Sequence, residues 1–485
     1  MRKKDFMPGA DLVGLTRRHF LQSSGVGLGG MALSGLLARD LGAKPSPETE
    51  KSKFGLHHKP RAKSVIQLFM AGGPSQFEMF ESKPDLQKFH NQPIPESFVK
   101  GRRFAFMDTF SKERPRLLGT KRKFERAGDG DLFVSELLPH FRTVVNDLAF
   151  VRTVATDVFN HAPAKIFFNT GSAQVGRPSL GSWLSYGIGS ESFDLPAFVV
   201  LQSGSRGPRG GVQNWGAGFL PSSHQGVPFR AQGDPIVNLS TPKGIDQGIQ
   251  GETIDALADL NSHHLAETGD LEIATRIRAY EMAYRMQSGA PDLIDLARET
   301  RETLDLYGAT PGRPSFANNC LLARRMVERG VRFIQLYHAD WDHHGDPTNH
   351  LDAPLEKVCR ETDRPAAALI LDLKRRGLLD DTLVIWGGEF GRTPMGEVRE
   401  HIGRNHHIDS FPMWFAGAGI KAGMVHGKTD EFGFGPTSGR VHVHDVQATI
   451  MHLCGIDHKR LTFRFQGRDF RLTDVHGELA TPILA

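Results

Sequence analysis

Short, almost uninterrupted apolar runs recur along this chain and constrain its fold more than any other feature of the sequence. Runs of this kind, without alternating polar residues, are typical of strands buried on both faces of a parallel sheet. Amphipathic stretches and Gly-rich or polar loops separate them, which indicates helices that cover such a sheet. The predicted strands are residues 65–70, 148–154, 197–202, 331–337, 382–386 and 412–417.

Three of the amphipathic stretches are predicted to be helices. Residues 316–330 and about 355–376 stop at Gly330 and at Gly377, and glycine is a favoured residue at a helix C-terminus. The third stretch, 271–286, places four large side chains on one face at helical spacing: Ile273, Ile277, Tyr280 and Tyr284. We therefore expect a three-layer α/β/α architecture with a mostly parallel central sheet and with helical and loop insertions.

The composition narrows the class of partner. The chain has 485 residues, 39% of them hydrophobic and 24% charged, as expected of a folded globular protein. Its net charge of +4 is too diffuse over this length to predict binding to nucleic acid or to an anionic membrane. A small molecule or a surface-borne group is the expected partner. The cysteines, Cys320, Cys359 and Cys454, are few and far apart, so we expect buried thiols rather than disulfides.

The N-terminus resembles a twin-arginine export signal. Arg17 and Arg18 stand in "TRRHFLQ", which is followed by an uncharged, Gly-rich stretch from residue 23 to residue 38. This stretch is too short and too glycine-rich for a stable membrane span. The alternative is an ordinary first helix. We expect a signal over 1–43, a linker over 44–62 and the folded domain over 63–485, with the twin-arginine translocation machinery as a partner and a periplasmic or cell-surface location.

Polar clusters follow several predicted strands, at the edge of a parallel sheet where ligand sites are built. "ADWDHHGD" contains Asp342 and His344, "GGEFGRTP" contains Glu389, and "GRNHH" adds His406 or His407 just before the last predicted strand. Carboxylates mixed with imidazoles suit Zn, Mn or a related divalent ion. A solvated loop is the alternative for any one cluster alone, but three clusters at strand ends favour a metal site.

The sequences of these clusters resemble motifs of the alkaline phosphatase and sulfatase superfamily. Within it, they resemble the exported sulfatase-like branch called domain of unknown function 1501. The matching phrases extend over most of residues 63–477. They include "LFMAGGPSQFEMFESKP", "FNHAPAKIFFNTGSAQVGRPSLGSW", "WDHHGD", "WGGEFGRTP" and "GRNHHIDSFPMWFAGAGIKAG". The resemblance implies an alkaline phosphatase-like fold.

The resemblance also implies candidate catalytic residues. Sulfatases carry Cys/Ser-x-Pro-x-Arg at the start of a helix that ends in Thr-Gly, and "HAPAKIFFNTG" places His161 at the nucleophile, Pro163 at the proline and Lys165 at the arginine. Because neither Cys nor Ser stands at 161, the formylglycine route is not expected. His161 could be a nucleophile, a general acid or base, a metal ligand, or a residue that simply begins the helix. Lys165 could neutralise an oxyanion.

Five residues are implied as metal ligands by the same comparison: Glu78, Asp342, His344, Glu389 and His406. Glu78 is the candidate for the acid that the superfamily usually places after its first strand. Arg392 and Asn405 are the candidates for binding the substrate. Asn405 stands where members of the branch often carry Asp, and Arg392 could bind the substrate oxyanion or pair with an acid. His442 and His444 are interpreted as structural, beside a helix that Asp445 could cap.

The predicted function is that of an exported, metal-dependent hydrolase-like protein. It would act on a phosphate or sulfate ester, small or carried on a polysaccharide, with one or two divalent ions such as Zn, Mn, Mg or Ca. The alternative is a catalytically inactive, metal-stabilised binding or scaffold protein of the cell envelope. A phosphomutase has less support, because the usual Ser or Thr nucleophile is not found at position 161.

Overall fold

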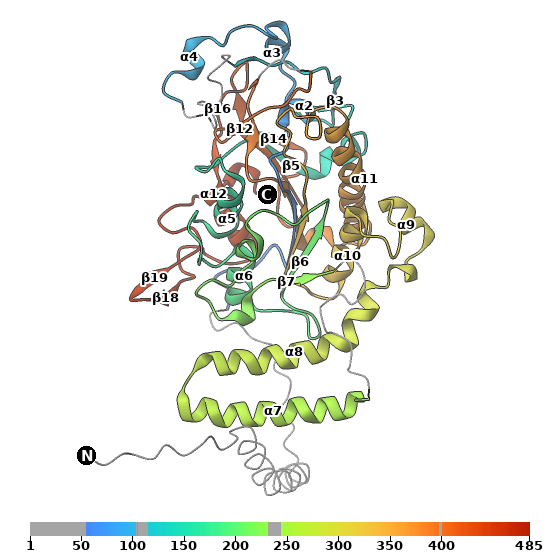
Figure 1. Ribbon diagram of the computed structural model, residues 1–485, viewed down its shortest axis with the longest axis vertical. Coiled ribbons are helices and arrows are strands. Elements are labelled where there is room, and N and C mark those ends of the chain that lie inside the picture. The colour runs from blue at the N-terminus through green and yellow to red at the C-terminus, as the bar shows by residue number, and fades with distance from the viewer. Residues whose placement is uncertain (1–54, 103, 105–114, 231–243, 397–399) are drawn as a thin grey trace, which may run out of the picture.

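The computed structural model describes residues 55–102, 104, 115–230, 244–396 and 400–485 (Figure 1). The predicted export signal and residues 44–54 of the predicted linker lie outside the described residues. The rest of that linker packs on the folded body, where the backbone N–H groups of Arg61 and Ala62 each donate to the carbonyl of Leu453 at 2.8 Å. Among the described helices, none combines the length and the apolar character needed to cross a membrane.

A nine-stranded sheet forms the centre of the molecule, in the order β14-β5-β13-β9-β1-β8-β6-β7, with β17 beside β5 (Figure 1). All six predicted strands belong to this sheet. The strands are β1 (Ser64–Met70), β5 (Leu148–Ala155), β6 (Phe198–Ser203), β7 (Val227–Phe229), β8 (Phe333–His338), β9 (Thr382–Gly387), β13 (Phe411–Ala416), β14 (Met424–His426) and β17 (Val441–His442).

The sheet is mostly parallel, as predicted, and β13 is the strand that departs from the pattern. It runs antiparallel to both of its neighbours, β5 and β9. The other pairs along the sheet are parallel. The start of β13 therefore lies at the same edge as the carboxyl ends of its neighbours, so residues before β13 can meet residues that follow the parallel strands.

Helices cover both faces of the sheet and complete three layers, as expected (Figure 1). Alternate side chains of β1 enter different cores: Ile66 and Leu68 face one, and Val65 and Phe69 the other. The first core is closed by α10 (Phe316–Glu328) and α11 (Ala353–Arg375), and the second by α5 (His161–Thr170), α6 (Leu180–Ile188) and α12 (Val443–Leu453).

Glycine ends two of the predicted helices as expected. Gly330 and Gly377 follow α10 and α11 with φ of 79° and 69°, a left-handed conformation that glycine adopts without steric cost.

The cysteines Cys320, Cys359 and Cys454 are buried and form no disulfide, which confirms the prediction of buried thiols.

The predicted helix over 271–286 is part of a longer helical hairpin. It lies within α8 (Leu271–Ile294), which packs against α7 (Gln247–Thr268) at one end of the molecule (Figure 1). Ile273 is buried, whereas Tyr280 is 46% exposed. The expected apolar face is therefore only partly covered.

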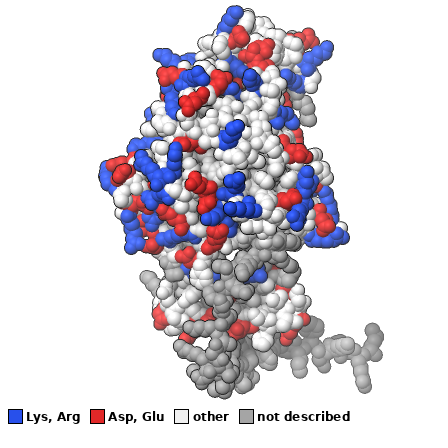
Figure 2. Space-filling model, turned by 180° about the vertical axis from the view of Figure 1, so that it is seen from behind, with Lys and Arg blue, Asp and Glu red and all other residues white. Residues whose placement is uncertain are grey.

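Figure 2 shows basic and acidic side chains interspersed over the face of the molecule opposite to that in Figure 1.

Short elements complete the described part of the chain. The short helices are α2 (Gln76–Met79), α3 (Pro84–Lys88), α4 (Glu96–Val99) and α9 (Arg301–Tyr307). Strand pairs join β2 (Arg116–Leu117) to β11 (Met395–Gly396), β3 (Phe124–Ala127) to β4 (Leu132–Ser135), β10 (Gly391–Arg392) to β12 (His406–His407), β15 (Lys428–Thr429) to β16 (Pro436–Ser438) and β18 (Phe463–Phe465) to β19 (Arg468–Phe470). The pairing of β10 with β12 sets Arg392 opposite His406.

Burial predicts which leucines stabilise the fold. Leu369 of α11 is fully buried, whereas Leu260 of α7 is 64% exposed. We expect Leu369→Ala to lower the free energy of unfolding by about 2–5 kcal/mol, because it removes core contacts and leaves a cavity. Leu260→Ala is the matched control and should change it by less than about 0.5 kcal/mol. Urea unfolding followed by circular dichroism measures both, and equal losses would contradict the assignment of the core.

Candidate metal centre

Several segments meet at the sheet edge that contains the carboxyl ends of the parallel strands. His161 begins α5, which follows β5, and Asp342 and His344 follow β8. Glu389 follows β9. His406 precedes β13 and reaches the same edge because that strand is antiparallel. The topology thus brings together residues that are far apart in the sequence.

Four of these side chains converge closely. One nitrogen each of His161, His344 and His406 and one oxygen of Asp342 all lie within 4.8 Å of one another. Asp342 Oδ1 lies 3.0 Å from His161 Nε2, 2.9 Å from His344 Nε2 and 3.6 Å from His406 Nε2. The Nε2 atoms of His344 and His406 are 2.9 Å apart. Ligands held tetrahedrally at about 2.0–2.1 Å from zinc lie about 3.3 Å from one another. The four separations given above, from 2.9 to 3.6 Å, are close to that value.

The hydrogen-bond partners of two of the histidines also fit a cation. His406 Nδ1 donates to the carbonyl of Phe159 at 2.5 Å, and His161 Nδ1 donates to Glu389 Oε1 at 2.7 Å. A neutral ring that carries its proton on Nδ1 presents a bare lone pair on Nε2. The buried His161 Nε2 makes no hydrogen bond, although it lies close to Asp342. A lone pair beside a carboxylate is repulsive unless a cation lies between them, and this pattern is typical of metal-ligating histidines.

Glu389 lies behind His161 rather than within the group of four. Its carboxylate is fully buried and also contacts Lys165 Nζ at 2.7 Å and the backbone N–H of Gly72 at 3.0 and 3.2 Å. Burial raises the pKa of Glu389, but Lys165 and His161 outweigh this effect and lower the pKa to about 2. The predicted ligand Glu389 is thus placed as the ionised carboxylate that fixes the ring of His161, and Lys165 balances its charge.

Arg392, predicted to bind substrate, lies behind Asp342. Its side chain is fully buried and donates to the carbonyl of Gly73 at 2.8 Å, to the carbonyl of Arg404 at 2.9 Å and to Asp342 Oδ1 at 2.7 Å. Burial raises the pKa of Asp342, yet its close contacts with the three histidines of the group and the charge of Arg392 hold it well below its usual range. Arg392 therefore orients Asp342 and, together with the three histidines, keeps it ionised.

Glu78, the fifth predicted ligand, is not brought into the group. Its carboxylate is buried against the guanidinium of Arg404, with Nη2 at 2.7 Å and Nε at 3.1 Å. Ser75 also donates to Glu78. The physical reason is pairing: a buried guanidinium takes up the acceptor capacity of this carboxylate. The loop after β1 instead contributes backbone groups, since the Gly72 N–H binds Glu389.

The remaining predicted residues lie around the centre. Asn405 is half-buried and pairs through its backbone with Thr393, whose N–H donates to the Asn405 carbonyl at 2.9 Å. Of the two histidines left open, His406 enters the group, whereas His407 is buried beside Phe104. His442, His444 and Asp445 lie at the start of α12, in keeping with their structural interpretation. His442 and Asp445 form a capping box, and His444 contacts the Gly171 carbonyl at 3.0 Å.

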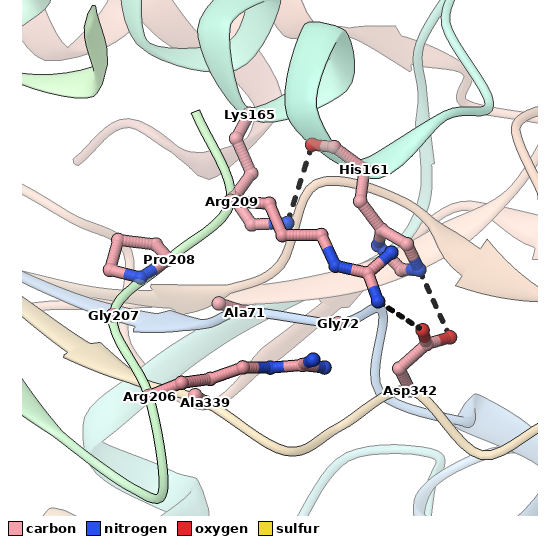
Figure 3. Close-up of a pocket in the computed structure, with 10 residues that line it drawn as sticks. All are labelled: Ala71, Gly72, His161, Lys165, Arg206, Gly207, Pro208, Arg209, Ala339 and Asp342. Carbon is pink, nitrogen blue, oxygen red and sulfur yellow. Dashed lines mark hydrogen bonds and ion pairs between the residues drawn. The ribbon is translucent and has the colours of Figure 1, made fainter. Parts of the chain in front are cut away.

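A pocket opens on this centre, and two residues that the sequence analysis missed line it. Figure 3 shows Arg206 and Arg209, from the loop after β6, extending across the pocket toward His161 and Asp342. The available signal was "SRGPR" directly after the predicted strand at 197–202, the position where ligand sites are built in parallel sheets. The other lining residues are Ala71, Gly72, Lys165, Gly207, Pro208 and Ala339.

Comparisons with known proteins agree with the motifs. A family model described as "Protein of unknown function (DUF1501)" matches residues 62–484. No curated protein sequence matches this chain.

Solved structures that resemble the chain share little sequence with it. The PsFucS1 sulfatase from Pseudoalteromonas sp. is 12% identical over 88% of this chain and 72% of that chain, with a TM-score of 0.38. The lipoteichoic acid synthase LtaP from Listeria monocytogenes is 9% identical over 89% and 78%, with a TM-score of 0.32. The alkaline phosphatase from the Antarctic bacterium TAB5 is 13% identical over 74% and 92%, with a TM-score of 0.29.

The buried pair of Glu389 and Lys165 predicts a strong non-additive effect on stability. Glu389→Gln should lower the free energy of unfolding of the metal-free protein by about 3–5 kcal/mol, because it leaves the Lys165 ammonium buried without its counter-charge. Lys165→Met in the same chain should recover much of that loss, since the uncompensated cation is then gone. Urea unfolding of both single variants and the double variant measures the coupling. Additive losses would contradict the pairing.

Proposed function

This chain belongs to the DUF1501 family, and we propose that it is an exported, metal-dependent hydrolase of phosphate or sulfate esters. One observation carries the proposal: His161, Asp342, His344 and His406 direct ligand atoms at one point, and a buried acid and a buried arginine fix two of them from behind. Sites whose ligands are oriented by such outer partners are typical of functional metal centres.

Three imidazoles and one carboxylate favour Zn or Mn over Mg or Ca, which prefer oxygen ligands. A divalent ion bound there would supply Lewis-acid polarisation of an ester oxygen and would lower the pKa of a water molecule. The residues of the chain would hold the ion and orient its ligands. Glu389 keeps the His161 proton on Nδ1, and Arg392 keeps Asp342 ionised and directed at the centre.

Among the roles left open for His161, we propose that of a metal ligand. Its Nδ1 is engaged by Glu389 and its Nε2 points into the group of four, so neither nitrogen is left to attack a substrate. Lys165 is paired with Glu389 but also lines the pocket. We propose that it maintains the charge of Glu389 and adds positive potential to the site.

The ester class rests on the resemblance of residues 161–171 to the segment that carries the nucleophile in sulfatases. Because a histidine stands at the first position, the proposed route uses an activated water rather than formylglycine. The substrate would be a small ester or one carried on a polysaccharide. Export through the twin-arginine machinery to the periplasm or cell surface belongs to the same proposal and rests on residues 1–43.

One observation favours a second candidate function, a metal-stabilised binding or scaffold protein of the cell envelope. Four protein ligands fill a tetrahedral shell, as in structural zinc sites, whereas catalytic sites keep a position open. Against this, the His344 side chain is 31% exposed, so the centre is accessible from one side. Expansion to five ligands on that side would admit a substrate oxygen.

Metal content is the first test of both candidates. We expect about one equivalent of Zn or Mn in the purified protein by elemental mass spectrometry, and its loss in Asp342→Ala and in His406→Ala, which each remove a converging ligand atom. His263→Ala, at an exposed histidine of α7, is the matched control and should retain the metal. A wild-type protein that stays metal-free after incubation with Zn, Mn, Mg and Ca would refute both candidates.

Turnover separates the two candidates. We expect the metal-loaded protein to hydrolyse p-nitrophenyl phosphate or p-nitrophenyl sulfate, the chelated protein to be inactive, and added metal to restore the rate. The metal should also stabilise the fold by about 2.7 kcal/mol when its free concentration is 100 times Kd, as thermal unfolding would record. Stabilisation without turnover on either ester would favour the scaffold and contradict the hydrolase.

A further inference from the structure

The loop after β6 forms one wall of the pocket beside the group of four ligands. Arg206, Gly207, Pro208 and Arg209 all line the pocket, and both guanidinium groups extend over it (Figure 3). Arg209 Nη2 lies 3.9 Å from Asp342 Oδ2, and half of the Arg209 side chain is exposed. Two arginines therefore face the centre from the solvent side.

Both ends of this loop are anchored. Asp340 accepts from Ser205 N at 2.8 Å and from Ser205 Oγ at 2.6 Å, and buried Asn214 donates to the carbonyl of Arg209 at 3.3 Å. Asp340 has a left-handed φ of 76°, a conformation that Asn and Asp adopt more readily than other residues with a side chain. Asp340 also lies two residues before the ligand Asp342, so one short segment fixes both the arginine loop and the metal ligand.

The two arginines differ from the other cations of the site in how their charge is balanced. Lys165 is paired with Glu389, and Arg392 with Asp342, at 2.7 Å in each case. Within the part of the chain that the structure describes, Arg206 has no carboxylate within ion-pair distance and is attracted only at longer range by Asp340, while Arg209 lies 3.9 Å from Asp342 Oδ2. The pocket is thus lined by positive charge in excess of what the protein neutralises.

From this arrangement we propose that Arg206 and Arg209 bind the non-bridging oxygens of a terminal phosphate or sulfate group and make the site selective for monoesters. A planar guanidinium matches two oxygens of such a group. A diester presents fewer charged oxygens, so two guanidinium groups would favour it less than a monoester. This inference rests on the proposed function, because it names the substrate class of the same site.

The test is calorimetric titration of the metal-loaded protein with inorganic phosphate and, separately, with sulfate. Arg206→Ala and Arg209→Ala should each weaken binding of the preferred anion about tenfold, and the double variant about 100-fold, since each removes a charge-assisted contact. Ser205→Ala, which removes one anchor of the loop, should weaken it less. The comparison of the two titrations identifies whether phosphate or sulfate is preferred.

Arg276→Ala is the matched control. This exposed arginine belongs to α8, at the opposite end of the molecule from β12, which carries His406 (Figure 1). It should bind both anions with wild-type affinity. Equal metal content and circular dichroism spectra show that a variant is folded and loaded.

Anion titration does not require turnover, so failure of the inference is distinguishable from failure of the proposed hydrolysis. Loss of anion affinity in the double variant supports anion binding by Arg206 and Arg209 even if no ester is hydrolysed. Wild-type affinity in the double variant, or no anion binding by the wild-type protein, overturns it. Where p-nitrophenyl phosphate is hydrolysed, the ratio of its kcat/KM to that of bis(p-nitrophenyl) phosphate should fall about tenfold or more in the double variant. An unchanged ratio contradicts the claimed selectivity.

Discussion

The geometry of the candidate metal centre depends on the buried carboxylate of Glu389. It joins the loop after β1, the start of α5 and the end of β9 through Gly72, Lys165 and His161. A carboxylate without these partners would not remain ionised at full burial. Its charge in turn fixes the proton of His161 on the ring nitrogen that faces away from the centre, which leaves Nε2 to bind a cation.

The reversed strand β13 is the second requirement. In an all-parallel sheet, a residue just before a strand lies at the edge opposite to the site. Because β13 is antiparallel to β5 and β9, His406 instead lies beside Asp342, and the short pair β10–β12 sets it opposite Arg392. Sheet direction therefore decides which histidine can join the ligand group.

The sequence predicted the strands and layers well, because burial on both faces leaves a direct imprint on residue type. It also singled out Asp342, His344 and His406. It could not separate ligands from supporting acids, since that difference depends on distant partners: Glu78 is paired with Arg404, 326 residues away. Arg206 and Arg209 were missed because their relation to the centre depends on how the loop after β6 is anchored. The direction of β13 also left no mark on its composition.

The separation of the ligands along the chain gives the centre a mechanical consequence. The facing nitrogens of His344 and His406 are 62 residues apart in sequence, and His161 lies on a third, still more distant segment. A cation held by all of them would act as a cross-link that closes large loops, and closing such loops restricts the unfolded chain much as a disulfide does. The cysteines of this protein form no disulfide. The ion would therefore be the cross-link that joins the start of α5 to the segments after β8 and before β13.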